Sequence, residues 1–186
     1  TFTCMIGLAA IAKPLIIVLI GEKWLQAVYF LQIICFAGML YPLHAINLNI
    51  LQVKGRSDLF LNLEIIKKII AVGPIVAGMF WGIECMLWGS VLTSFISFFL
   101  NSYYSADLIN YPTWKQIKDI LPTLLVSGIT ALAMWSLTFV NMPMFFLLLL
   151  QCLLGLVLSI FIYERLRLEE YLEVKHIILS LLSRKK

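Results

Sequence analysis

Charged residues are scarce in this sequence, and long stretches of it have none. Only 13% of the 186 residues are Asp, Glu, Lys or Arg, whereas 62% are apolar, and the mean hydropathy is +0.98. Runs without charge extend over residues 24–53, 85–106 and 120–163. Each run is long enough to cross a bilayer, and a soluble fold could not bury so much apolar surface. The composition excludes a soluble domain and predicts an all-α membrane protein.

Signatures of catalysis, metal binding and disulfide bonding are also missing. Cys4, Cys35, Cys85 and Cys152 stand far apart, with no CxxC pair and no His at ligand spacing. There is no Gly-rich phosphate loop, no Ser-His-Asp order and no pair of carboxylates within a predicted span. The net charge of +4 comes without a basic patch interleaved with aromatics. We therefore expect no enzyme, no metal or other cofactor, and no nucleic-acid partner.

The charge-free runs and the turn residues between them divide the chain into six predicted spans. Residues 120–163 would make a helix of roughly 66 Å at 1.5 Å per residue, against a hydrocarbon core of about 30 Å, so Asn141-Met142-Pro143 is expected to separate two helices. The spans lie near residues 1–20, 27–52, 59–81, 85–106, 120–140 and 144–163. Residues 164–186 are predicted to form a cytoplasmic amphipathic tail, and Trp114, Ile117 and Leu121 a short interfacial lead-in to the fifth span.

The basic residues indicate the orientation of these spans. They gather in the second connection, the fourth connection and the tail: Lys54, Arg56, Lys115, Lys118, Arg165, Arg167, Lys175, Arg184, Lys185 and Lys186. The other connections hold only Lys23. With six spans the two sets fall on opposite sides, and the positive-inside rule places the basic set, including the C-terminus, in the cytoplasm. Because Thr1 begins inside an apolar run without a basic n-region, we expect no signal peptide and a truncated chain.

The third span carries a charged cluster at a depth where charge is costly. Glu64, Lys67 and Lys68 stand at helical spacing i, i+3 and i+4, and one acid cannot neutralise two bases. In one interpretation Glu64 pairs with one lysine while the other extends to the lipid headgroups. In the other, Lys67 and Lys68 form a cationic wall that receives an anionic lipid headgroup.

Polar side chains also follow Pro42 in the second span. His44 and Asn47 share a helix face, Asn49 and Gln52 come next, and the proline is expected to kink the helix. These groups either join neighbouring helices by hydrogen bonds or recognise the hydroxyl groups of a sugar.

Lys13 is the third polar feature, a lone lysine deep in the first span beside Pro14. It either lines a cavity or pairs with an acid elsewhere in a longer protein. The candidate substrate-binding residues are therefore Lys13, His44, Asn47, Lys67 and Lys68.

Several local patterns resemble one family of membrane transporters. They are Pro14-Leu15-Ile16 with Leu19-Ile20-Gly21-Glu22-Lys23-Trp24, then Pro42-Leu43, Asn47 and Lys54-Gly55-Arg56-Ser57-Asp58, and Leu63-Glu64-Ile65-Ile66-Lys67-Lys68. Together they are similar to the polysaccharide flippases of the multidrug/oligosaccharidyl-lipid/polysaccharide exporter superfamily, in the branch that handles lipopolysaccharide O-antigen and capsule units.

This resemblance implies a fold of two six-helix lobes around a cavity, often with two further helices, of which this chain would be the C-terminal portion. It implies translocation of undecaprenyl-pyrophosphate-linked oligosaccharide across the bacterial inner membrane for polysaccharide biosynthesis. The expected partners are this substrate, membrane lipids and the polysaccharide polymerase machinery.

Two other functions stay open at the level of the sequence. A cation-coupled drug or metabolite antiporter of the same superfamily would need an acid deep in a span, and the middle of these spans has none. A membrane scaffold subunit without transport activity would need no polar cavity between its helices.

The distribution of basic residues predicts a cytoplasmic C-terminus. An alkaline phosphatase fused after Lys186 should be inactive, because that enzyme matures only in the periplasm, whereas a green fluorescent protein at the same position should fluoresce. Fusions after Gly82, in a connection predicted to be external, should give the opposite pair of results. Phosphatase activity after Lys186 would contradict the span count.

Overall fold

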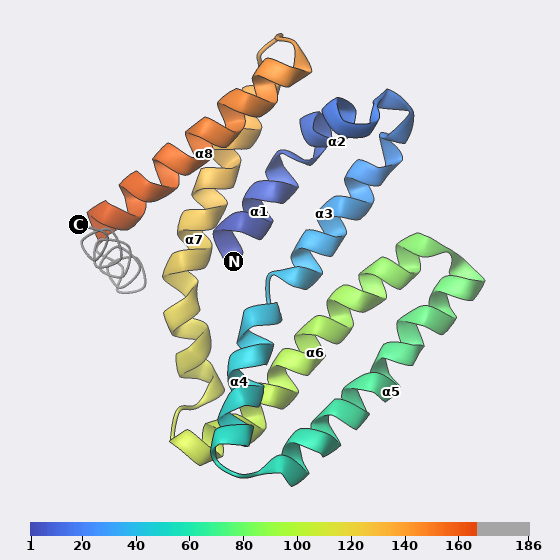
Figure 1. Cartoon of the computed structure of the whole chain (residues 1–186), viewed down its shortest axis with the longest axis vertical. Coiled ribbons are helices and arrows are strands. Elements are labelled where there is room, and N and C mark those ends of the chain that lie inside the picture. Colours follow the sequence, from blue (N-terminus) through green and yellow to red (C-terminus); the bar gives the residue numbers. More distant parts are fainter. Residues whose placement is uncertain (167–186) are drawn as a thin grey trace, which may run out of the picture.

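The computed structural model describes residues 1–166, which form helices and turns with no strand among them. The α-helices are α1 (Phe2–Ala10), α2 (Ala12–Ile20), α3 (Gln26–Gly38), α4 (Tyr41–Val53), α5 (Ser57–Trp81), α6 (Ile83–Ile109), α7 (Thr113–Ser136) and α8 (Met144–Leu166). Two 3₁₀ turns, Glu22–Trp24 and Leu137–Phe139, precede α3 and follow α7. Figure 1 shows α4, α5 and α6 at one end of the bundle and α1, α2 and α8 at the other, with α3 leading from one group to the other and α7 running alongside both.

Four helical stretches in the described residues are long and apolar enough to cross a membrane: Gln26–Val53, Ile83–Ile109, Thr113–Phe139 and Met144–Leu166. A fifth is added if α1 and α2 count as one span bent by 67°. Six spans were expected, and the remaining one corresponds to α5, whose 25 residues include the charged Glu64, Lys67 and Lys68. These helices confirm the prediction of an all-α, multi-pass membrane protein.

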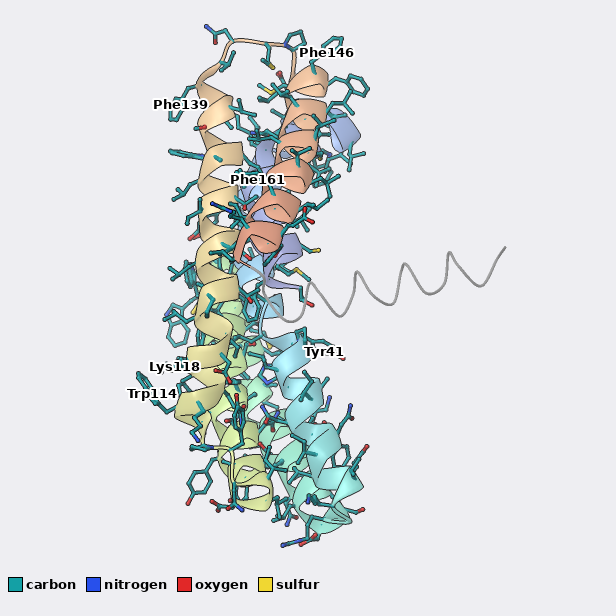
Figure 2. All side chains as sticks on the ribbon, turned by 90° about the vertical axis from the view of Figure 1, so that its left-hand side faces the viewer. Tyr41, Trp114, Lys118, Phe139, Phe146 and Phe161 are labelled. Atoms are coloured by element: carbon teal, nitrogen blue, oxygen red, sulfur yellow. The ribbon has the colours of Figure 1, made fainter. Side chains whose placement is uncertain are left out.

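The surface of the bundle is apolar and much of its buried interior is polar, the reverse of a soluble protein. Large aromatic side chains point outward along its length in Figure 2, with Trp114 and Phe139 each 73% exposed and Phe161 65% exposed. Asn101 and Gln151, in contrast, are fully buried. Lipid can cover the apolar surface, whereas polar side chains have no water to bind in the hydrocarbon region and turn inward.

Prolines explain where the first two predicted spans are interrupted. The first span is two helices meeting at Ile11, because Pro14 has no N–H to bond to the carbonyl of Ala10 and its ring crowds that carbonyl. In the second span the break falls at residues 39–40, and Pro42 lies in the first turn of α4, where its missing N–H costs nothing. The expected kink after Pro42 is therefore a break just before it.

The fifth predicted span begins earlier than expected. Helix α7 starts at Thr113, directly after Pro112, so the predicted interfacial lead-in is its first turns and not a separate segment. The predicted amphipathic tail beyond Leu166 lies outside the described residues.

Helix α6 is the central element of the end of the bundle that contains α4 and α5. Helices α3, α4 and α5 all pack against it, and α4 and α5 contact each other much less. A turn at Gly82 reverses the chain from α5 into α6, and its φ of +90° with ψ of 174° is a conformation that only glycine adopts readily. Next to this turn the helices approach closely, since a Cβ on Gly89 would lie 2.9 Å from Cβ of Pro74.

We expect Gly89→Ala to destabilise the pairing of α5 with α6. The added methyl group would also lie 3.2 Å from Cα of Pro74, so backbone has to move, at a cost of about 1–3 kcal/mol. Gly128→Ala in α7 is the matched control, because a Cβ there meets nothing within 4 Å. Unfolding in detergent should show a loss for Gly89→Ala alone, and equal stability of the two variants would contradict the close approach.

Candidate functional site

A groove of about 930 Å³ lies between α4, α5 and α6. Helix α6 forms the floor of the groove. One wall is α4 together with the end of α3, and the other wall is α5, in keeping with the position of α6 between α4 and α5 in Figure 1. The groove contains His44, Lys67 and Lys68 of the predicted set, and does not contain Lys13 or Asn47.

The α5 wall of the groove is cationic. Lys67 donates a hydrogen bond to Glu64 and both side chains are half-buried, so this pair is close to neutral. Lys68 also lines the groove, is exposed, and forms no ion pair within residues 1–166. Of the two lysines that the sequence left equivalent, the structure assigns Lys67 to Glu64 and leaves the charge of Lys68 directed at the groove.

The other acid near the start of α5 does not compensate Lys68. Arg56 donates two hydrogen bonds of 3.1 Å to the two carboxylate oxygens of Asp58. These bonds from Arg56 hold the pKa of Asp58 below its ordinary value and raise the pKa of Arg56. The positive charge of the groove therefore stays uncompensated on this side.

On the α4 wall, His44 is held by the floor of the groove. Its Nε2 lies 3.3 Å from Oγ of Ser94, which in turn donates its single proton to the carbonyl of Ala37 at 2.8 Å. Nε2 must therefore be the donor to Ser94, which leaves Nδ1 of the neutral ring as an acceptor. Nδ1 is buried and has no hydrogen-bond partner in the structure.

Asn47 points away from the groove and joins three helices. Its Nδ2 donates to Oε1 of Gln116 on α7 at 3.1 Å and to the carbonyl of Leu43 at 3.0 Å, and its Oδ1 accepts from Ser105 of α6 at 2.6 Å. Its amide group is thus engaged by the protein itself. The spacing in the sequence predicted that Asn47 and His44 share one helix face. In the structure the side chain of Asn47 forms hydrogen bonds with α6 and α7, whereas the imidazole of His44 lines the groove.

Lys13 lies outside this group of residues. It is exposed on α2, next to the buried Pro14, and makes no ion pair among the residues that the structure describes. Helix α2 packs against α8 and α3, away from α5. The structure therefore does not bring Lys13 together with Lys68 and His44.

Sequence reasoning missed the floor of the groove. Ser90, Thr93, Ser94 and Ser97 of α6 all line it, opposite the exposed amides of Asn49 and Gln52 on α4. The spacing of the four hydroxyl residues places them on one helix face, and this pattern within a charge-free span was the signal available.

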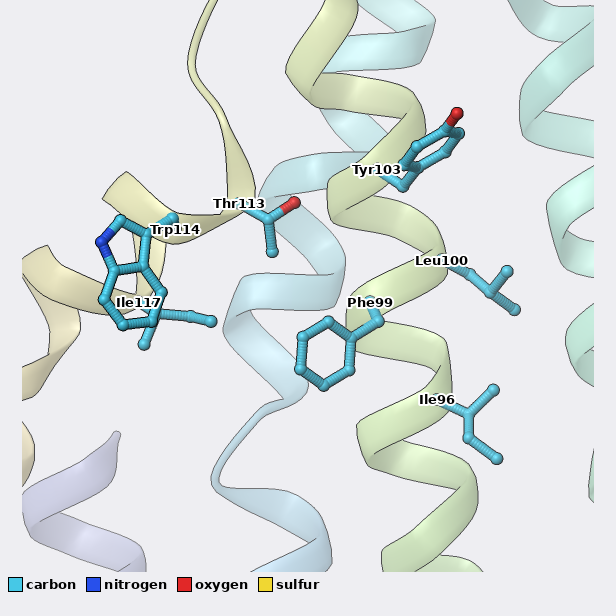
Figure 3. Close-up of a pocket in the computed structure, with 7 residues that line it drawn as sticks. All are labelled: Ile96, Phe99, Leu100, Tyr103, Thr113, Trp114 and Ile117. Carbon is cyan, nitrogen blue, oxygen red and sulfur yellow. The ribbon is translucent and has the colours of Figure 1, made fainter.

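A second hollow, between α6 and α7, has a different character. It measures about 550 Å³ and its lining is almost wholly apolar, with Phe99 of α6 and Trp114 and Ile117 of α7 around it (Figure 3). The hydroxyl of Thr113 accepts a hydrogen bond from Ser102. A surface of this kind suits lipid tails, because little of it is polar. Within residues 1–166 no three His, Cys, Asp or Glu side chains gather as metal ligands would.

The chain is similar in sequence to two bacterial proteins. It is 39% identical over 59 residues to the teichuronic acid biosynthesis protein TuaB of Bacillus subtilis (strain 168), a match that covers 32% of this chain and 12% of TuaB. It is 30% identical over 80 residues to an uncharacterized membrane protein in the cps region of Klebsiella pneumoniae, covering 43% of this chain and 16% of that protein. The chain thus matches less than a fifth of the length of either relative.

Neither a family model nor a solved structure matches the chain. The two similarities support the broader part of the expected assignment, a membrane protein related to polysaccharide biosynthesis.

We expect replacement by leucine to destabilise the protein at Asn47 but not at Asn49. Asn47→Leu would leave Gln116 and Ser105 without their partner in a buried position, at a cost of about 1–3 kcal/mol. Asn49→Leu removes an exposed amide of the same helix and should leave stability nearly unchanged. Unfolding of both variants in detergent checks this, and a larger loss for Asn49→Leu would exclude the three-helix role of Asn47.

Proposed function

We propose that this chain is part of a flippase that moves an oligosaccharide, joined by pyrophosphate to a polyprenyl lipid, across the bacterial inner membrane during polysaccharide biosynthesis. The observation that carries the proposal is the groove between α4, α5 and α6, in which Lys68 lies among amide and hydroxyl groups and has no acidic partner within residues 1–166. A pyrophosphate needs a cation inside the membrane, and a glycan needs hydrogen-bonding groups. The similarity to a teichuronic acid biosynthesis protein supports the part of the proposal that concerns polysaccharide biosynthesis.

The position of Lys68 suits a first contact with the substrate. It lies eleven residues after Ser57, roughly 16 Å along α5 at 1.5 Å per residue, from the end of the helix that the basic connection predicts to be cytoplasmic. Lysine binds phosphate as a point charge on a flexible stem, so its ammonium can reach toward the inner headgroups where such substrates are made.

The groove gives less support to the two other functions that the sequence left open. An antiporter needs an acid that can take up and release a cation, and Glu64, the only acid that lines the groove in the described part of the chain, is paired with Lys67. A scaffold has no use for a polar groove of this volume between its helices, because polar surface inside a membrane is costly.

We expect Lys68→Ala to lower transport at least tenfold, and Glu64→Gln to restore part of it in the same chain. Removing the acid releases Lys67, one helical position away, to serve as the cation in place of Lys68. Lys68→Arg should retain part of the activity. The measurement is the amount of surface polysaccharide in a strain that lacks the protein and is complemented with each variant, divided by the amount of the protein.

Lys118→Ala is the matched control, since it removes an exposed lysine that does not line the groove. If Lys68 served only to anchor α5 to the headgroups, its loss would lower the amount of protein and leave transport per molecule unchanged. Full normalised transport by Lys68→Ala, and by the variant with both Lys67 and Lys68 replaced by alanine, would refute the proposed role.

A further inference from the structure

Three of the four hydroxyl groups on the floor of the groove are already committed as donors. Ser90 donates to the carbonyl of Met86 and Thr93 to the carbonyl of Gly89, each at 2.9 Å, while Ser94 donates to Ala37 at 2.8 Å. A hydroxyl has one proton and two lone pairs, so a hydroxyl whose proton is used presents only acceptor sites to its surroundings. At Ser90, Thr93 and Ser94 the α6 floor is therefore an acceptor surface.

The α5 wall has the opposite character. Ammonium groups such as that of Lys68 carry three donors and no acceptor, while the exposed amides of Asn49 and Gln52 on α4 offer both. An anion placed on the floor would set its lone pairs against those of Ser90 and Thr93, while the same anion at Lys68 finds charge and donors. The groove is thus polarised across its width, from a cationic wall to an acceptor floor.

We propose that the substrate lies across this groove in one orientation, with its pyrophosphate against α5 and a neutral, hydroxyl-bearing sugar on α6. This inference rests on the proposed function and adds a specificity to it. The sugar donates hydroxyl protons to Oγ of Ser90 and Oγ1 of Thr93, so the floor selects a neutral sugar at that position and disfavours a carboxylate or a phosphate there. Ser94 contributes less, since one of its lone pairs accepts from His44.

The strength of this preference follows from the cost of turning a hydroxyl proton away from its helix carbonyl and toward the ligand. To face an anion with a proton, Ser90 or Thr93 has to give up its bond to a helix carbonyl, and a hydrogen bond of this kind is worth about 1 kcal/mol net. Each hydroxyl therefore favours a ligand group that donates a proton over one that only accepts, by about fivefold in binding affinity.

Fluorinated sugars test the direction of these hydrogen bonds, because fluorine in place of a hydroxyl group cannot donate a proton. The full chain in lipid nanodiscs would be titrated with a farnesyl-pyrophosphoryl hexose, with its monofluoro derivatives at each hydroxyl position, and with farnesyl pyrophosphate. We expect at least one fluoro derivative to bind about fivefold more weakly than the parent, reflecting one lost hydrogen bond.

The preference for the parent hexose should disappear in the double variant Ser90→Ala, Thr93→Val, to which parent and fluoro ligands should bind alike. Thr130→Val is the matched control, because Thr130 donates in the same manner to the carbonyl of Val126 at 2.9 Å but lies on α7 outside the groove. Circular dichroism of the variants checks that the helices are retained, and each single variant gives an independent reading if the double variant does not fold.

The outcomes separate this inference from the function on which it rests. If farnesyl pyrophosphate binds and Lys68→Ala abolishes that binding, but every fluoro derivative binds wild type as well as the parent does, the orientation is refuted and the proposed function stands. A fluorine effect that persists in the double variant also refutes it, since the accepting group then lies elsewhere. If farnesyl pyrophosphate shows no binding that depends on Lys68, the proposed function and the orientation are both rejected.

Discussion

A polar group inside a bilayer has to find its hydrogen-bond partner within the protein, and this requirement organises the bundle. Asn47 joins α4 to α6 and α7, Thr3 of α1 is bonded to Ser127 of α7, and Gln151 of α8 donates to the carbonyl of Met134 at 2.8 Å. Helices that share an apolar surface with lipid have little other reason to choose particular neighbours. The groove departs from this pattern, because Lys68 and the exposed amides of Asn49 and Gln52 have no partner among the residues that the structure describes.

The sequence was sufficient to predict those features of the fold that depend only on the composition of a single segment. Charge-free runs located the helices because a bilayer requires length and apolarity and little else. The prolines indicated where helices would be interrupted, but not by how much. The bend of 67° at Ile11 depends on how α1 packs on α7 and α2 on α8, which are contacts between distant parts of the chain.

The candidate site could be predicted only in part for a similar reason. Glu64 can reach either Lys67 or Lys68 by helical spacing, and the choice depends on the neighbouring helices. Whether an asparagine of α4 faces the groove or the bundle interior depends on how that helix is rotated about its axis. In the structure Asn47 faces the interior and Asn49 faces the groove. The hydroxyl residues of α6 attracted no notice because serine and threonine are ordinary packing residues in membrane helices, and their importance arises from what faces them.

The charged cluster of α5 has a consequence for how the chain enters the membrane during its synthesis. A lysine or an aspartate at the centre of a helix costs about 2.5–3.5 kcal/mol on insertion scales, so α5 alone is a poor substrate for the translocon. Gly82 joins it through a tight turn to the strongly apolar α6, against which it packs at Pro74 and Gly89. The two helices are thus suited to leave the translocon together as a hairpin, so the membrane integration of α5 depends on a segment that the ribosome completes only after it.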